Sequence, residues 1–191
     1  MYESFIDAFR LCAIAQKIFG ADTYVFASCM TTLTLNNFAF IDSQNINLGV
    51  NSLGWKLDWK RFRIHLKESC GVSTAYVFIG FLPENQGLYQ SLQRFGYVLI
   101  FKPVTYRGDG KAKGNVDAEL VLQAMIDLDN YERAVIVTSD GDFGCLVRYL
   151  YEKRKLERVL SPSRRSCSVL LKKSSPGKGR LPGRCQKKDR V

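Results

Sequence analysis

The middle of the chain alternates between short apolar runs and segments whose apolar residues recur at helical spacing. The apolar runs predict strands over residues 38–42, 72–81, 97–104, 134–139 and 158–161. Helical spacing predicts helices over residues 59–69, 85–95, 116–128 and 143–153, with a loop between 42 and 58. Strands separated by helices are typical of a parallel sheet covered on both faces. The pattern therefore predicts an α/β three-layer sandwich with a central, mostly parallel sheet.

The two ends of the chain differ from this alternating region. Residues 1–29 carry apolar residues at helical spacing, and Met30 begins a short polar lead into the first strand. We interpret residues 1–35 as an N-terminal extension, either upstream of a natural start at Met30 or an extra helix packed on the domain. Residues 36–172 are then the folded domain. The segment 173–191 is rich in Lys, Arg, Gly and Pro, which predicts a basic tail without fixed structure.

The formal net charge of +10 is concentrated at the C-terminal end. Residues 1–159 carry 18 Lys and Arg against 17 Asp and Glu, whereas residues 160–191 carry 10 basic residues and one acidic residue. A basic tail suits the phosphates of a nucleic acid, but a solvated tail without a ligand explains the composition equally well. No apolar run approaches the ~20 residues that a membrane span requires.

Cysteine and histidine usage excludes one class of metal site. The six cysteines are scattered without a C-x-x-C pair, and His65 is the only histidine. A zinc site needs ligands clustered at short spacing, so zinc is not expected. Residues 1–29 carry acids before their first base, unlike the basic start of a signal peptide. We therefore expect reduced thiols and a cytoplasmic protein.

Four aspartates lie where an apolar run ends or a helical pattern begins. Asp42 ends the first run, Asp140 follows the run 134–139, and Asp142 comes two residues later, across a glycine. Asp117 lies in the first turn of a predicted helix. Ligands of open α/β sheets bind outside the carboxyl ends of the strands, where these acids would converge. Clustered carboxylates repel one another unless a cation holds them, which predicts a Mg²⁺ or Mn²⁺ site.

Each of these acids also has an ordinary structural explanation. Asp42 could be a turn acid, Asp117 and Asp140 could cap helices, and Asp142 could be a first-turn acid. Glu119 lies about 200° around the helix from Asp117, so the two carboxylates can hardly serve one site. Near the first acid, Asn45 offers an amide that could position a phosphate.

A glycine-rich, basic segment precedes the helix of Asp117. Residues 107–115 lack the G-x-x-x-x-G-K-[ST] pattern of a P-loop, since alanine follows Lys111. We interpret the segment as a loop beside the site whose basic side chains contact phosphates, although a merely solvated loop fits equally well. The candidate nucleic-acid-binding residues, here and near the tail, are Arg107, Lys111, Lys113, Arg164 and Arg165.

Three motifs, in this order and spacing, resemble the NYN domains of the PIN-like nuclease superfamily, with the LabA-like bacterial branch most similar. They are F-I-D-S-Q-N at 40–45, N-V-D-A-E-L at 115–120 and V-T-S-D-G-D-F at 137–143. The resemblance covers residues 38–171. It implies a PIN-like, Rossmann-like sheet with acids at one end, a bound divalent metal and ribonuclease activity. It also implies metal binding by Asp42, Asp117, Asp140 and Asp142, with Asn45 and Ser139 as accessory polar groups.

These observations together predict a small metal-dependent ribonuclease acting on single-stranded or structured RNA, with Mg²⁺ or Mn²⁺ activating a water molecule. The main alternative is an RNA-binding or regulatory module whose acids are weakly active or inactive. A phosphatase of the haloacid-dehalogenase type would need a second acid two residues after Asp42, where Gln44 stands. The sequence allows a homodimer and leaves open the choice between RNA and DNA and between internal and terminal cleavage.

Overall fold

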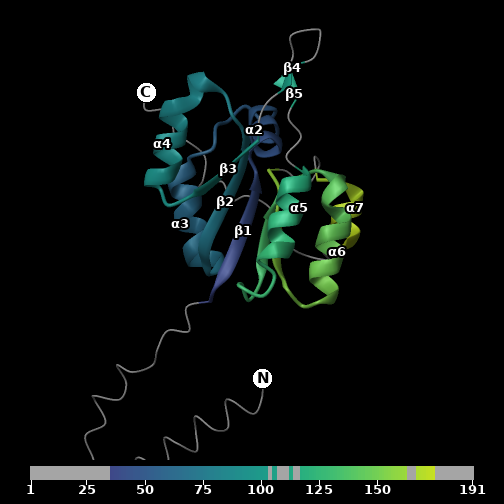
Figure 1. Ribbon diagram of the computed structural model, residues 1–191. Coiled ribbons are helices and arrows are strands. Elements are labelled where there is room, and N and C mark those ends of the chain that lie inside the picture. The colour runs from purple at the N-terminus through teal and green to yellow at the C-terminus, as the bar shows by residue number, and fades with distance from the viewer. Residues whose placement is uncertain (1–34, 103–104, 107–111, 114–116, 163–166, 175–191) are drawn as a thin grey trace, which may run out of the picture. The chain divides into compact units, whose positions relative to one another are not determined.

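A five-stranded parallel sheet forms the centre of the described part of the protein. The computed structural model describes residues 35–102, 105–106, 112–113, 117–162 and 167–174 (Figure 1). The strand order is β3-β2-β1-β6-β7, and every neighbouring pair is parallel. The strands are β1 (Asn37–Asp42), β2 (Val72–Gly80), β3 (Val98–Lys102), β6 (Ala134–Val137) and β7 (Leu156–Leu160). The prediction of an α/β fold with a mostly parallel sheet is confirmed.

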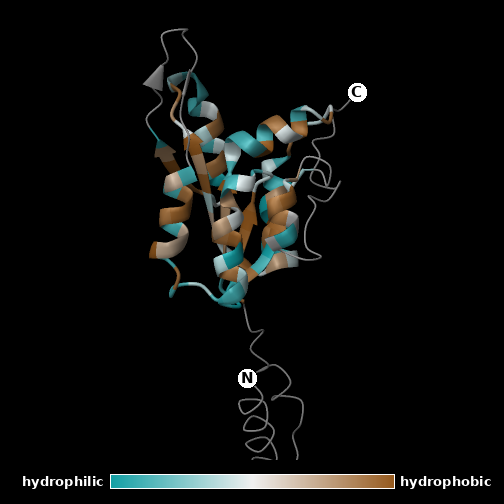
Figure 2. Cartoon of the chain, turned by 90° about the vertical axis from the view of Figure 1, so that its right-hand side faces the viewer, coloured by the Kyte–Doolittle hydropathy of each residue, from teal (hydrophilic) through white to brown (hydrophobic). Residues whose placement is uncertain are grey.

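Helices cover both faces of the sheet (Figure 1). One face carries α2 (Ser43–Asn51), α3 (Trp59–Cys70) and α4 (Gln86–Arg94), the last preceded by the short 3₁₀ helix η2 (Pro83–Asn85). The opposite face carries α5 (Asp117–Ile126), the 3₁₀ turn η3 (Gly141–Phe143), α6 (Gly144–Glu152) and α7 (Val169–Ser174). Two hydrophobic clusters fill the spaces between sheet and helices. The strands are mostly hydrophobic, whereas the helices also carry hydrophilic residues (Figure 2).

The helix predicted over 59–69 shows how local sequence sets these boundaries. Asp58 caps α3 by accepting a hydrogen bond from the Arg61 backbone N–H at 3.0 Å. Gly71 ends the helix in the left-handed conformation, with φ of 63°. A Cβ at this glycine would lie 2.6 Å from the Leu35 Cβ, so close packing also requires glycine. Of the helices in the described ranges, none is long and apolar enough to span a membrane.

The structure corrects the prediction of a loop between 42 and 58. Helix α2 begins directly after β1, because the Asp42 carboxylate accepts a hydrogen bond from the Asn45 backbone N–H at 3.0 Å. Ile46 and Val50 are fully buried against the sheet. Two further elements were not predicted: α7 and the short antiparallel pair β4 (Thr105–Tyr106) and β5 (Ala112–Lys113).

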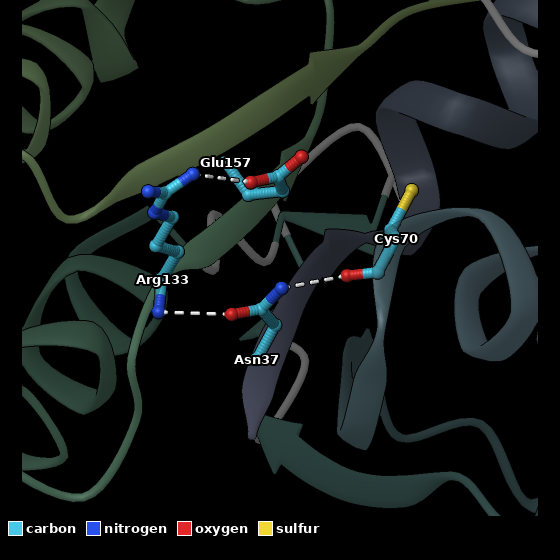
Figure 3. A network of polar contacts seen from close by, with 4 residues as sticks. All are labelled: Asn37, Cys70, Arg133 and Glu157. Atoms are coloured by element: carbon cyan, nitrogen blue, oxygen red, sulfur yellow. Dashed lines mark hydrogen bonds and ion pairs between the residues drawn. The ribbon is translucent and has the colours of Figure 1, made fainter. Parts of the chain in front are cut away.

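A buried amide ties together the N-terminal ends of three strands (Figure 3). Asn37 is fully buried; its Nδ2 donates to the Cys70 carbonyl at 2.7 Å, and its Oδ1 accepts from the Arg133 backbone N–H at 3.0 Å. Cys70 ends α3 before β2, and Arg133 directly precedes β6. The guanidinium of Arg133 also pairs with Glu157 of β7 at 3.2 Å. One side chain thus connects the chain on both sides of β1.

Candidate metal centre

The candidate site lies where the strand order changes direction. From β1 the chain passes to β2 and β3 on one side, and later to β6 and β7 on the other. Crevices at the carboxyl ends of strands form at such switch points. Asp42 is the last residue of β1, and Asp140 comes three residues after Val137, the end of the neighbouring β6. The fold therefore brings together two acids that are far apart in the sequence.

Three of the four predicted acids form a compact cluster. Asp117, the first residue of α5, joins Asp140 and Asp142 so that one carboxylate oxygen from each lies within 4.8 Å of the other two. The first two are half-buried and Asp142 is exposed. Hard divalent cations such as Mg²⁺ and Mn²⁺ prefer oxygen ligands, and Mg²⁺ keeps several waters when bound by few carboxylates. The donor set therefore fits an ion of this kind.

The fourth acid, Asp42, lies deeper and is held by hydrogen bonds. Its side chain is 4% exposed and accepts from the Asn45 backbone N–H and, at 3.3 Å, from the Thr138 hydroxyl. Burial raises its pKa to about 6, and the charges of Asp117 and Asp140 act in the same direction against those two hydrogen bonds. Asp42 therefore shares the electrostatic field of the cluster, and a nearby cation would favour its ionised form.

The capping role of these acids is compatible with metal binding. Asp42 caps α2, and Asp140 caps the turn η3 by accepting from the Asp142 backbone N–H at 3.1 Å. These hydrogen bonds fix the carboxylates without neutralising them. Capping is thus the local means by which the chain orients two of the acids toward one place.

Polar side chains connect the ends of β1, β6 and β7. The Asn45 Oδ1 accepts from the Ser139 backbone N–H at 2.8 Å, and the Ser139 and Ser161 hydroxyls lie 3.0 Å apart. The amide oxygen of Asn45 therefore holds the first turn of α2 to the loop after β6, and the positioning of a phosphate by its amide group stays a prediction. The two side chains predicted as accessory groups lie at the site.

Sequence reasoning missed Thr138. Its hydroxyl donates to the Asp42 Oδ2 and accepts from the Asp140 backbone N–H at 3.1 Å, so it joins the two strand ends directly. The side chain is fully buried. A threonine at the end of an otherwise apolar run was the available signal, since a buried hydroxyl needs a hydrogen-bond partner.

The remaining candidates fall outside the cluster or outside the described residues. Glu119 forms an ion pair with Lys102 at 3.0 Å, as expected if it cannot share a site with Asp117. Arg107, Lys111, Arg164 and Arg165 lie outside the described residues, and Lys113 is described only as part of the backbone of β5. Their contact with nucleic acid stays a prediction.

Comparison with known proteins identifies the family. The sequence model of the NYN domain matches residues 38–175. The chain belongs to the NYN domain family. NYN domains are part of the PIN-like nuclease superfamily, which confirms the resemblance at this level, whereas assignment to the LabA-like branch stays a prediction.

A solved structure supports the fold independently. A protein of unknown function from Vibrio parahaemolyticus superposes with a TM-score of 0.67 and is 21% identical, covering 83% of this chain and 100% of that chain. At this identity the likeness shows a shared fold. No curated protein matches the chain significantly.

Proposed function

We propose that this NYN domain is a ribonuclease that uses a divalent cation, Mg²⁺ or Mn²⁺, to hydrolyse phosphodiester bonds of RNA. One observation carries the proposal: three carboxylates from two separate elements meet within 4.8 Å at the switch point of an NYN-family sheet. Nuclease-type function is what the family suggests, and the acidic cluster can hold an ion.

The acids of the site would have different roles according to how deeply they are buried. Asp117, Asp140 and Asp142 would hold the cation, with Asp42 as the buried acid beneath them. When bound, such a cation lowers the pKa of a coordinated water and stabilises charge on the phosphate. Thr138 and Asn45 fix the two strand ends and so keep the acids at their spacing. The only histidine of the sequence, His65, is buried in α3, and the acids gathered at this site are Asp42, Asp117, Asp140 and Asp142.

The first test neutralises two of the three clustered acids and keeps the hydrogen bond that caps η3. In the Asp140→Asn/Asp142→Asn variant the amide oxygen at 140 can still cap η3, so the fold is retained. We expect cleavage of end-labelled single-stranded RNA in Mn²⁺ or Mg²⁺ to slow by at least about 100-fold, as when other preorganised electrostatic groups are removed. EDTA should abolish cleavage by the wild type.

A matched control changes the same charge elsewhere. The Asp129→Asn/Glu132→Gln variant alters two exposed acids at the N-terminal end of the sheet and should cleave at the wild-type rate. Wild-type activity in the Asp140→Asn/Asp142→Asn variant, or cleavage that survives EDTA, would reject the metal-dependent mechanism. Tight RNA binding without any cleavage by the metal-loaded wild type would favour a binding module on this fold.

A further inference from the structure

We infer that the corner between α2 and α3 binds the RNA strand beyond the cleavage site, an inference that rests on the proposed function. This basic corner consists of Trp55, Lys56, Trp59 and Lys60. None of these residues belongs to the glycine-rich segment or the tail, where the sequence predicts phosphate contacts.

Positive charge in the described chain is concentrated here. Residues 53–67 contain five basic residues and one acid, whereas the other described residues contain 11 basic and 12 acidic ones. Arg63 is used structurally, donating to three backbone carbonyls, and Arg61 pairs with Asp58. Lys56 and Lys60 are exposed, and neither has an ion pair within the described part of the chain. These two ammonium groups are available to phosphates.

The aromatic residues of the corner are held in place by packing against the hydrophobic core. Both tryptophans pack partly buried against the core cluster under α3. The Trp59 ring packs edge-on against Tyr97 with ring centroids 5.6 Å apart, and the Tyr97 hydroxyl donates to the Trp59 carbonyl at 2.9 Å. The backbone N–H of Trp55 donates a hydrogen bond to the Val50 carbonyl, which closes the turn between them. An indole that is packed on the core and partly exposed beside lysines is a typical platform for an unpaired base.

Helix α2 links the corner to the candidate metal centre along the chain. Helix α2 begins directly after Asp42 and has nine residues, which corresponds to a length of about 13 Å. Figure 1 shows α2 beyond the carboxyl end of the sheet, and the chain enters α3 from there. A strand with one phosphate at the acids can therefore follow α2 to the lysines. Alternating aromatic and basic residues match single-stranded RNA better than a duplex, whose bases are not free to stack on the protein.

Binding measured without cleavage tests the inference separately from the proposed function. The full-length protein would be titrated against a fluorescein-labelled oligouridine by fluorescence anisotropy in EDTA, at several salt concentrations. In Lys56→Gln/Lys60→Gln, we expect the affinity near 0.1 M salt to fall about 10- to 30-fold. The slope of log K against log salt concentration should become about 1.4 less steep, as for two lost single-strand phosphate contacts. Trp55→Leu keeps an apolar side chain against the core cluster and should weaken binding about fivefold or more.

The control removes two exposed charges from another helix and its end. Arg148→Gln/Lys153→Gln on α6 makes the same change in net charge and should bind within about twofold of the wild type. Unchanged affinity in Lys56→Gln/Lys60→Gln, or an equal loss in the α6 control, would overturn the inference even if the wild type cleaves RNA. If the corner variants lose affinity but the metal-loaded wild type never cleaves RNA, the inference is supported and the proposed function is rejected.

Discussion

The two ends of strand β1 are both held by asparagine side chains, but they enclose different chemistry. At the N-terminal end, Asn37 is neutral, fully buried and bonded to backbone groups on both sides. At the carboxyl end, Asn45 makes a similar link to Ser139, but the buried side chain beside it is Asp42, whose pKa is raised to about 6. One end is arranged for stability alone, and the other keeps an acid where ionisation is unfavourable. Strongly perturbed acids in a crevice are typical of functional sites.

The largest expected effect on stability comes from removing Asn37 at the N-terminal end of β1. Asn37→Ala leaves the buried Cys70 carbonyl and Arg133 N–H without their partner, which should lower the free energy of unfolding by about 4 kcal/mol. Urea denaturation would measure the change. Asn36→Ala, an exposed neighbour, should cost less than about 1 kcal/mol. Similar small losses in both variants would show that the buried amide does not hold the strands.

The second prediction concerns how the stability of the protein depends on pH through Asp42, at the carboxyl end of β1. Since the pKa of Asp42 rises from 3.8 to about 6 on folding, the folded state binds a proton more tightly than the unfolded state between these values. The metal-free wild type should therefore lose stability as pH rises through this window and change little above it. The loss is on the order of 3 kcal/mol.

Asp42→Asn resembles the protonated acid and tests that sign. In EDTA near pH 8 the variant should unfold at higher urea concentration than the wild type, whereas near pH 4 the two should coincide. Added Mn²⁺ should stabilise the wild type and reduce the difference. A variant less stable than the metal-free wild type near pH 8 would contradict the account.

The smallest effect concerns the turn that carries Asp140 and Asp142. A Cβ on Gly141 would lie 2.6 Å from the Ser168 Oγ, which already accepts a hydrogen bond from the Leu170 backbone N–H. Gly141→Ala should therefore destabilise the protein by about 1 kcal/mol. Gly87→Ala in α4, with nothing within 4 Å of its Cβ, should be neutral or stabilise by up to about 1 kcal/mol. Equal urea midpoints for the two variants would rule out this packing constraint.

The sequence predicted the elements whose pattern is strong. Within the described residues, every predicted strand and helix has a counterpart, from β1 to β7. Helix α2 was missed because residues 43–51 are rich in Asn and contain Gly49, so local helix propensity is weak. Burial of Ile46 and Val50 against the sheet overrides that propensity.

The candidate site was predictable in composition but not in arrangement. Strand-end positions suggested four converging acids, and the structure brings Asp117, Asp140 and Asp142 together. Spacing could not show that Asp42 lies deeper than the other three, because depth depends on the helices packed around it. The role of Thr138 depends on a hydrogen bond to a residue 96 positions away, which no local pattern contains.

The pairing of β1 with β6 also determines when the site can exist. Phe38 pairs with Ala134, so the sheet becomes continuous across the switch point only after the chain has been synthesised through β6. Closing a loop of this length costs about 4 kcal/mol of chain entropy, and only later contacts offset it. A nascent chain or fragment that ends before β6 has Asp42 and Asp117 but lacks Asp140 and Asp142. Assembly of the acidic centre therefore requires that β6 and η3 have been synthesised.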